Sequence, residues 1–262
     1  MINCKIINWI KSKPFYIFEV KSFLEEEFYN KLSKNFPDLP TIEKNKFTVF
    51  KNNKYALKSE SDIYKEVLEN NLYVKQFDNL INSDEFKKIF FWKNFIKILL
   101  SRGLNLKHFF KMLRIPKFVK NINRKSFFYK FGIFSKFQIT IQYSYILDGG
   151  FIVPHPDAGN KLLTLMIYFP EYAHEQKNLQ KLEMGIGTTF WDSEINNNNN
   201  NHIEEHEKLE DFYKNSNIMY KSLFQKNSIV GFIKNQYSFH SVEPINVHKN
   251  YIRKSININI WY

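Results

Sequence analysis

Three side chains of types that bind metal ions are spaced along the sequence so that they could lie close together in the folded chain. His155 and Asp157 flank Pro156, and residues i and i+2 of an extended segment point to the same side. An imidazole nitrogen and a carboxylate oxygen can therefore reach one point in space. Two protein ligands do not make a site, and the third candidate is His240, in the strand-like segment 237–242. We predict that His155, Asp157 and His240 bind one metal ion.

This ligand set indicates a particular metal chemistry. Two histidines and one carboxylate form the facial triad typical of non-haem Fe(II) oxygenases. The triad covers one face of an octahedron, so a 2-oxo acid can chelate the metal through two open positions and O2 can take the last. Zinc is more often held by four tetrahedral ligands, or by three and a water molecule, and the ligand types alone leave zinc open.

A dicarboxylate cosubstrate needs a cation at its far end, and Arg253 follows His240 in the last strand-like segment. A guanidinium can grip a carboxylate with two parallel hydrogen bonds, and the hydroxyl of Ser255, on the same face of the strand, can add a third. Polar side chains alternate with isoleucines along this segment: Ser255, Asn257 and Asn259 against Ile256, Ile258 and Ile260. The alternation predicts a strand with one face on a polar cavity and the other on a hydrophobic layer.

The motifs, taken in order, resemble one known family. Residues 154–157 (Pro-His-Pro-Asp), 240–244 (His-Ser-Val-Glu-Pro) and 253–255 (Arg-Lys-Ser) are similar to motifs of the prolyl-4-hydroxylase-like branch of the 2-oxoglutarate- and Fe(II)-dependent oxygenases. Residues 185–191 look like the Gly-x-Thr-x-Phe strand of that branch, and residues 162–169 look like its buried core strand. The resemblance covers residues 13–40 and 138–262, whereas residues 41–137 match no motif.

The resemblance implies an α+β fold, with a double-stranded β-helix (jelly roll) core flanked by N-terminal helices. It implies an enzyme, a dioxygenase that uses Fe(II), 2-oxoglutarate and O2. Such an enzyme couples the decarboxylation of 2-oxoglutarate to succinate and CO2 with hydroxylation of a C–H bond. Members of the family often use a tyrosine on the strand before His-x-Asp to contact the cosubstrate. Tyr143 and Tyr145 share a face of that strand, and we expect Tyr143 to take this role.

Two departures from the family pattern bear on the substrate. Collagen-type prolyl hydroxylases use lysine where Arg253 stands, and the loop before His155 is one residue longer. Both argue against a collagen-type peptide. We expect the substrate to be a small-molecule or sugar-linked metabolite, and this expectation includes anionic metabolites. The alternatives are a peptide or protein side chain as substrate, or a non-catalytic jelly-roll module that binds an anionic partner.

The chain carries a net charge of +12, and residues 86–147 contain no Asp or Glu. A solvated basic face around a packed aromatic stripe explains this segment better than a surface for an acidic substrate, and we do not expect a nucleic-acid partner.

Cys4 is the single cysteine, which excludes an intrachain disulfide. The N-terminus lacks the apolar stretch of a secretory signal, and the sequence has no run of about 18 apolar residues. We therefore expect a cytoplasmic protein without a membrane span.

The elements that must position these residues are predicted within one oxygenase domain, residues 1–262. Its N-terminal part, 1–136, is predicted to be helical and basic, and the jelly-roll core to span about 137–262 with a polar, Asn-rich, solvated insertion near 194–215. A capping box, Ser22 to Glu25, predicts a helix to about residue 35, and apolar spacing predicts helices over 62–81 and 83–101. The predicted strands are 15–20, 138–145, 151–155, 162–169, 186–191, 228–233, 237–241 and 255–261.

Overall fold

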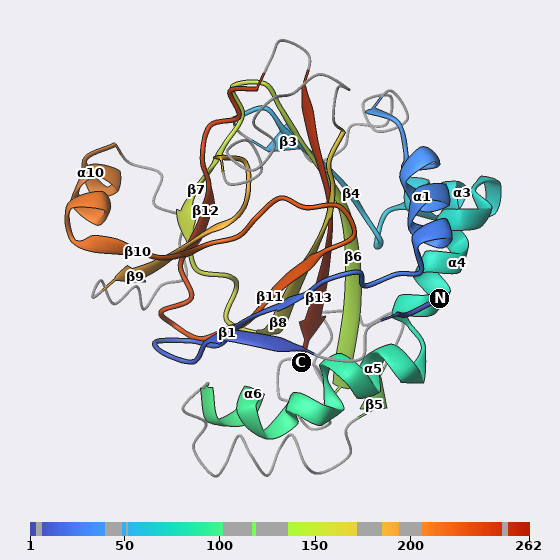
Figure 1. The fold of residues 1–262 in the computed structure, drawn as a ribbon, viewed down its shortest axis with the longest axis horizontal. Helices are drawn as coiled ribbons and strands as arrows, with labels where there is room; N and C mark the ends of the chain where they lie inside the picture. Colours follow the sequence, from blue (N-terminus) through green and yellow to red (C-terminus); the bar gives the residue numbers. More distant parts are fainter. Residues whose placement is uncertain are drawn as a thin grey trace.

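The structure is a computed structural model. It describes residues 1–3, 7–39, 49–50, 52–101, 117–118, 136–171, 185–193, 206–247 and 251–262. Most of the basic segment, and residues 194–205 of the predicted insertion, lie outside the described residues. The described part combines two mostly antiparallel sheets with helices (Figure 1).

The strands divide into a larger and a smaller sheet. The larger sheet contains β1 (Asn8–Lys11), β2 (Ile17–Val20), β3 (Val49–Phe50), β4 (Lys54–Lys58), β5 (Lys117–Phe118), β6 (Lys136–Leu147), β8 (Lys161–Phe169), β11 (Ile229–Ile233) and β13 (Ile252–Trp261). The smaller sheet contains β7 (Ile152–His155), β9 (Thr189–Ser193), β10 (Ser216–Lys221) and β12 (His240–Val242).

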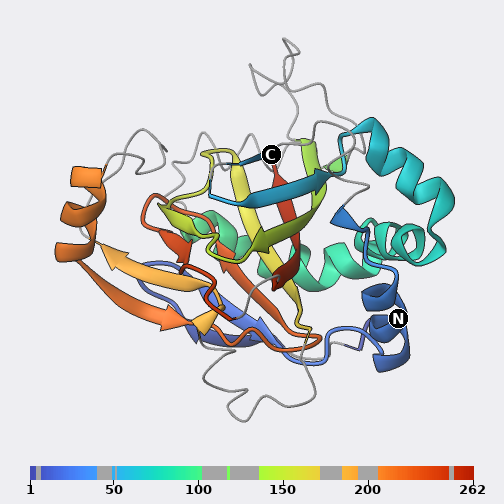
Figure 2. The same ribbon diagram turned by 90° about the horizontal axis from the view of Figure 1, so that it is seen from above.

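Strand order shows how the chain moves between the sheets. The larger sheet has the order β1-β2-β11-β8-β13-β6-β4-β3, with β5 parallel to β6, and the smaller has the order β10-β9-β12-β7. From β6 to β9 the chain alternates between larger and smaller sheet, and from β10 to β13 it alternates again in the opposite sense. The smaller sheet lies to one side of the larger one (Figure 2). This path brings the end of β7 and the start of β12 against the face of the larger sheet that is turned toward the smaller one, which we call its inner face.

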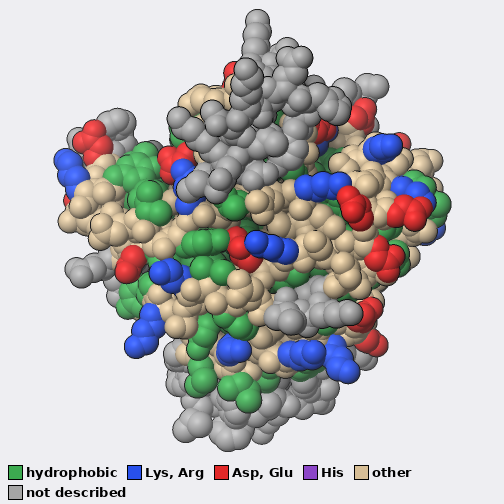
Figure 3. Space-filling model, in the orientation of Figure 1, with side chains coloured by type: hydrophobic (Ala, Val, Ile, Leu, Met, Phe, Trp, Pro, Cys, Tyr) green, Lys and Arg blue, Asp and Glu red, His purple; other side chains and the backbone are tan. Residues whose placement is uncertain are grey.

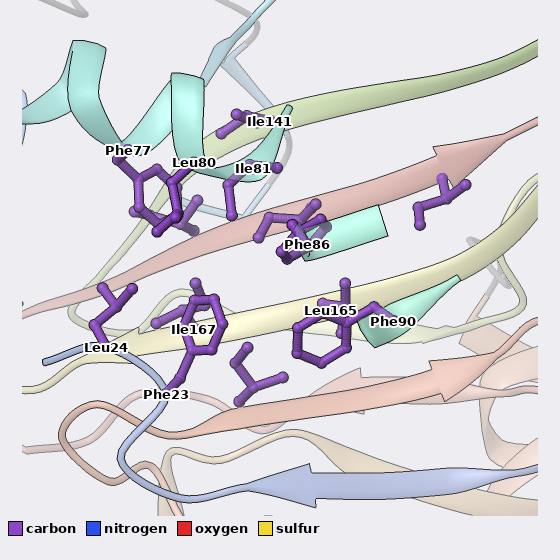
Figure 4. Close-up of a cluster of buried hydrophobic side chains, with 14 of the residues drawn as sticks. Phe23, Leu24, Phe77, Leu80, Ile81, Phe86, Phe90, Ile141, Leu165 and Ile167 are labelled. Carbon is purple, nitrogen blue, oxygen red and sulfur yellow. The ribbon is translucent and has the colours of Figure 1, made fainter. Parts of the chain in front are cut away.

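Helices cover the outer face of the larger sheet. They are α1 (Glu26–Lys34), α3 (Asp62–Asn70), α4 (Leu72–Ile81), α5 (Asp84–Phe90), the 3-10 turn η1 (Trp92–Asn94) and α6 (Phe95–Ser101). In Figure 4, Leu80 and Ile81 of α4 and Phe86 of α5 pack toward Ile141 of β6 and Leu165 of β8. The isoleucines of β13 belong to this same buried layer. Burial of these apolar side chains is the main force that holds the helices on the sheet.

The inner face of the larger sheet faces the smaller sheet and carries polar residues along β13. Ser255, Asn257 and Asn259 are directed to this side, opposite to the isoleucines between them. The alternation predicted from the sequence is therefore confirmed. A second apolar cluster, which includes Met166, Phe190 and Phe232, joins the two sheets beside these polar residues.

Several predicted boundaries were wrong for local reasons. The first helix begins at Glu26, because Ser22 has a left-handed backbone (φ 51°) and Phe23 and Leu24 are buried before the helix starts. The segment 62–81 forms two helices, because Asn71 adopts an extended backbone (φ −126°, ψ 101°) and its side chain caps α4. The segment 83–101 is likewise interrupted, by η1.

The predicted polar insertion contains a structured part. Residues 206–214 form helix α10 (His206–Lys214), which packs beside β10. Phe212 is fully buried, and its ring contacts Trp191 and Phe239. The expectation of a wholly solvated segment is corrected here, because Leu209 and Phe212 form an apolar stripe on the helix.

Two surface observations complete the description. In the part of the chain that the structure describes, no helix is long and apolar enough to cross a bilayer. On the face shown in Figure 3, Lys and Arg side chains are interspersed with Asp and Glu side chains. The positive charge of the described residues is therefore not gathered into one patch on that face.

Candidate functional site

The predicted metal ligands lie together at the edge of the smaller sheet. His155 ends β7, His240 begins β12, and the two residues are paired across these strands, with their ring centroids 4.4 Å apart. Asp157 follows two residues after His155. One ligand atom from each of the three lies within 4.8 Å of the others. The structure therefore brings the three residues to one point, as their spacing predicts.

Backbone carbonyls fix the orientation of both imidazole rings. The Nδ1 atom of His155 donates to the carbonyl oxygen of Val153 at 2.9 Å, and Nδ1 of His240 donates to that of Ser238 at 3.1 Å. A carbonyl can only accept, so Nδ1 carries the proton in each ring. In the neutral rings Nε2 is then the nitrogen that can serve as the ligand atom.

Asp157 is buried and held by two side chains. Its Oδ1 accepts from Nζ of Lys161 at 2.5 Å, and its Oδ2 accepts from Oγ1 of Thr164 at 2.7 Å. Burial opposes ionisation, but Lys161 and the two histidines hold the pKa of the Asp157 carboxyl well below its usual range. The carboxylate is therefore charged at neutral pH, and its oxygens retain lone pairs for a further ligand.

The protonation states of His240 and Asp157 suit a metal ion. Burial lowers the pKa of His240, which favours the neutral imidazole. Metal binding requires a neutral imidazole and an ionised carboxylate, and the site presents both. Two nitrogens and one oxygen on one side, with the remaining directions toward a cavity, fit the donor set of an Fe(II) facial triad.

Arg253 lines the same cavity and is 2% exposed. It stands on β13 six residues before Asn259, which contacts Thr164 beside Asp157, so it lies toward the other end of the cavity. Its Nε donates to the carbonyl oxygen of Ile186 at 2.6 Å, and its Nη1 donates to Oγ of Ser255 at 3.4 Å. The guanidinium carbon lies 4.7 Å from the ring centroid of Phe224 and 5.3 Å from that of Tyr168. Among the described residues, Nη2 has no hydrogen-bond partner. A buried cation with an unused donor is an anion-binding group.

The cavity between the sheets has a volume of about 280 Å³. This is close to the lower end of the range for small-molecule sites, roughly 300–1,000 Å³. Both the candidate metal ligands and Arg253 line it. Its other described polar and charged lining residues are Lys54, Gln142, Ser144, Lys161, Thr164, Thr188, Ser241, Ser255, Asn257 and Asn259.

One predicted site residue is not brought to this cavity. Tyr143 pairs with Ile256 of β13, so its side chain points to the outer, helix-covered face, where its ring lies 5.0 Å from that of Phe36. The assignment of Tyr143 to the cosubstrate is therefore corrected. Ser144, one residue further on, faces the cavity instead, whereas Ser255 lies beside Arg253 as predicted.

Three residues of the site escaped the sequence analysis. Lys161 and Thr164 contact Asp157 from the start of β8, and Lys54 reaches the cavity from β4. Lys161 stands four residues after Asp157 in the sequence, but only the turn between β7 and β8 brings its ammonium group to the carboxylate. Lys54 had no local signal, because β4 was not predicted as a strand.

Comparison with known proteins gives remote structural likenesses. No protein-family model and no curated protein matches the sequence. A prolyl-4-hydroxylase of Pseudomonas putida is 8% identical with a TM-score of 0.41, over 95% of this chain and 93% of that chain. HygX from Streptomyces hygroscopicus, solved with nickel, 2-oxoglutarate and hygromycin B, is 5% identical with a TM-score of 0.43, over 94% and 82%. The carbocyclase SnoK from nogalamycin biosynthesis, described as non-haem and α-ketoglutarate-dependent, is 8% identical with a TM-score of 0.46, over 94% and 79%.

Proposed function

We propose that this protein is an Fe(II)- and 2-oxoglutarate-dependent dioxygenase that hydroxylates a small-molecule or sugar-linked metabolite. The observation that carries the proposal is one cavity with two unlike ends. His155, Asp157 and His240 offer a three-ligand metal face at one end, and Arg253 offers a buried, partly unused guanidinium at the other. A 2-oxo dicarboxylic acid has a chelating group for the first and a carboxylate for the second.

We further infer that the two sheets form a double-stranded β-helix. Eight strands, β6 to β13, alternate between the sheets except at the β9–β10 hairpin. A chain that winds in this way builds a double-sheet jelly roll. In this arrangement the metal ligands come from the smaller sheet and the loop after it, and Arg253 comes from the larger sheet.

The roles of the residues follow from their contacts. The two histidines and Asp157 would hold Fe(II), while Lys161 and Thr164 keep the carboxylate of Asp157 oriented. Arg253, fixed by the carbonyl of Ile186, would pair with the distal carboxylate of 2-oxoglutarate, and Ser255 would support it. When bound, the metal supplies O2 chemistry that converts 2-oxoglutarate to succinate and CO2 and places one oxygen atom on the substrate.

The cavity favours a small substrate over a peptide side chain. It lies between the two sheets, and its volume of about 280 Å³ must also accommodate 2-oxoglutarate. Its lining is rich in hydroxyl and amide groups. A compact polar molecule suits these dimensions and this chemistry.

Anaerobic titration tests the proposed site. Fe(II) and 2-oxoglutarate together should give a weak visible charge-transfer band near about 500 nm, as expected for a chelated Fe(II) facial triad. His155→Ala and Asp157→Ala should lose the band, and His174→Ala, outside the proposed ligand set, should keep it. If the two ligand variants retain the wild-type band, the metal assignment is wrong.

A further inference from the structure

A second basic side chain lies in the same cross-strand row as Arg253. Lys54 of β4 pairs with Ile146 of β6, and Ile146 pairs on its other side with Arg253 of β13. Residues directly opposite each other in a sheet direct their side chains to the same face. Lys54 and Arg253 therefore both face the cavity, from strands whose backbones lie roughly 10 Å apart at ordinary strand spacing.

The described lining of the cavity is strongly basic. Lys54, Lys161 and Arg253 are its basic side chains, and Asp157 is the single acidic one among the lining residues that the structure describes. The proposed cofactors do not reverse this balance, because the two positive charges of Fe(II) and the charge of Arg253 together match Asp157 and the two charges of 2-oxoglutarate. Among the lining residues that the structure describes, the two lysines therefore leave a net positive charge when the cavity is loaded.

The two lysines lie at different places in the cavity. Nζ of Lys161 is paired with Asp157, and it also lies 5.0 Å from the ring centroid of Trp261. Its contacts assign it to the orientation of the metal-binding carboxylate. Lys54 is half-buried on another strand, at the side of the cavity away from β8. Burial, and then repulsion by Lys161 and Arg253, lowers the pKa of Lys54 to about 8.

Groups beside Lys54 are suited to a polar ligand. Gln142 and Ser144 precede Ile146 on the cavity face of β6, and Nε2 of Gln142 donates to Oγ of Ser144 at 2.8 Å. Lysine binds phosphate and carboxylate groups as a compact point charge, without the two-pronged geometry of arginine. An anionic group near Lys54 would also relieve the repulsion between the basic side chains.

We infer that Lys54 forms an anion subsite in this cavity and binds the carboxylate or phosphate group of the substrate, which is therefore a small organic anion. The role as a substrate site rests on the proposed oxygenase function. The anion subsite itself does not, because it is made by residues other than the metal ligands. Lys54 is a specificity-determining residue in this account.

Calorimetric titration with two anions tests the inference. Inorganic phosphate and, separately, acetate are titrated into the metal-free protein and into its anaerobic complex with Fe(II) and 2-oxoglutarate. At least one of the two anions should bind to the wild type. The anion that binds more tightly shows whether the subsite prefers a phosphate or a carboxylate group. Lys54→Met should weaken that binding about 10- to 100-fold, the effect of losing a charge-assisted contact. Lys54→Arg, which keeps the charge, should restore affinity to within a few-fold.

Lys58→Met is the matched control. Lys58 lies on the same strand and the same face, but it is not among the described residues that line the cavity. Lys58 does repel Lys54, but its replacement should weaken anion binding far less than Lys54→Met does. Thermal unfolding should show that each variant is folded.

Three results would overturn the inference: no binding of either anion by the wild type, equal binding by wild type and Lys54→Met, or an equal loss in Lys58→Met. A loss of 2-oxoglutarate affinity in Lys54→Met as large as the loss of anion affinity would also overturn it, because Lys54 would then belong to the cosubstrate site. Failure of the oxygenase proposal has a different signature. In that case the wild type lacks the charge-transfer band, while the metal-free protein still binds the anion through Lys54.

Discussion

Replacement of Arg253 by methionine should separate cosubstrate binding from metal binding. Methionine keeps an unbranched, apolar stem for the space between the rings of Phe224 and Tyr168, but it removes every donor. The metal ligands do not contact Arg253 in any hydrogen bond found among the described residues. We therefore expect Arg253→Met to bind Fe(II) as the wild type does and to bind 2-oxoglutarate much more weakly.

The size of the effect follows from the contacts of the guanidinium. Nε is already engaged by the carbonyl of Ile186, so Nη2, and Nη1 after release from its long 3.4 Å contact with Ser255, are the donors left for a carboxylate. Two charge-assisted hydrogen bonds are worth about 1.5–3 kcal/mol each. At about 1.4 kcal/mol for each factor of ten, the dissociation constant of 2-oxoglutarate should rise roughly 10²- to 10⁴-fold.

The assay is an anaerobic titration of the Fe(II)-loaded variants with 2-oxoglutarate, followed by the visible charge-transfer band. Ser255→Ala should weaken binding only several-fold, because it removes one neutral hydrogen bond of about 1 kcal/mol. Lys254→Met is the matched control, since Nζ of Lys254 is paired with Glu171 outside the cavity. Wild-type affinity for 2-oxoglutarate in Arg253→Met would refute the assignment of Arg253.

Further predictions concern the metal, the core and the anion subsite. Thr164→Val removes the donor to Oδ2 of Asp157, so Fe(II) affinity should fall about 10- to 100-fold, as measured by metal titration; an unchanged affinity would show that this bond does not orient the ligand. Phe90→Ala leaves a cavity among three phenylalanine rings and should lower the free energy of unfolding by about 3–5 kcal/mol in urea; a loss below about 1 kcal/mol would contradict the packing described. Because the pKa of Lys54 is about 8, its charge is lost as the pH rises through that value. The affinity for sulfate, whose own charge stays constant, should therefore fall from pH of about 7 to about 9, and Lys54→Arg should abolish this dependence. Among the described residues, the charged groups that act on Lys54 include Lys161, Arg253, Asp157 and Lys58. A flat pH profile in the wild type would contradict the role of Lys54.

The clustering of two of the proposed metal ligands could be predicted because their geometry is local. His155 and Asp157 need only an extended backbone to face the same point, and that property follows from the i, i+2 spacing. His240 is distant in sequence, and the order of the motifs predicted only that it joins His155; the pairing of the two residues across β12 and β7 is known from the structure. The two faces of β13 could also be predicted, because alternation within one strand is a local pattern.

Contacts that depend on register could not be predicted in this way. Tyr143 and Ser144 point to opposite faces of β6, and only the pairing of Ser144 with Ser255 decides which of them shares a face with Arg253. Lys54 shares the cavity because β4 pairs with β6, a contact between segments about 90 residues apart in the chain. Nothing in the short sequence of β4 specifies that neighbour.

Isotope labelling of succinate tests the central claim most directly. The purified protein is incubated with Fe(II), 2-oxoglutarate and ¹⁸O2, without added substrate, and the succinate from uncoupled turnover is analysed by mass spectrometry. Our account predicts succinate that carries one ¹⁸O atom with the wild type and with Lys254→Met, and no succinate above background with Asp157→Ala. Unlabelled succinate, or equal amounts from wild type and Asp157→Ala, would contradict the assignment of this site as an oxygenase centre.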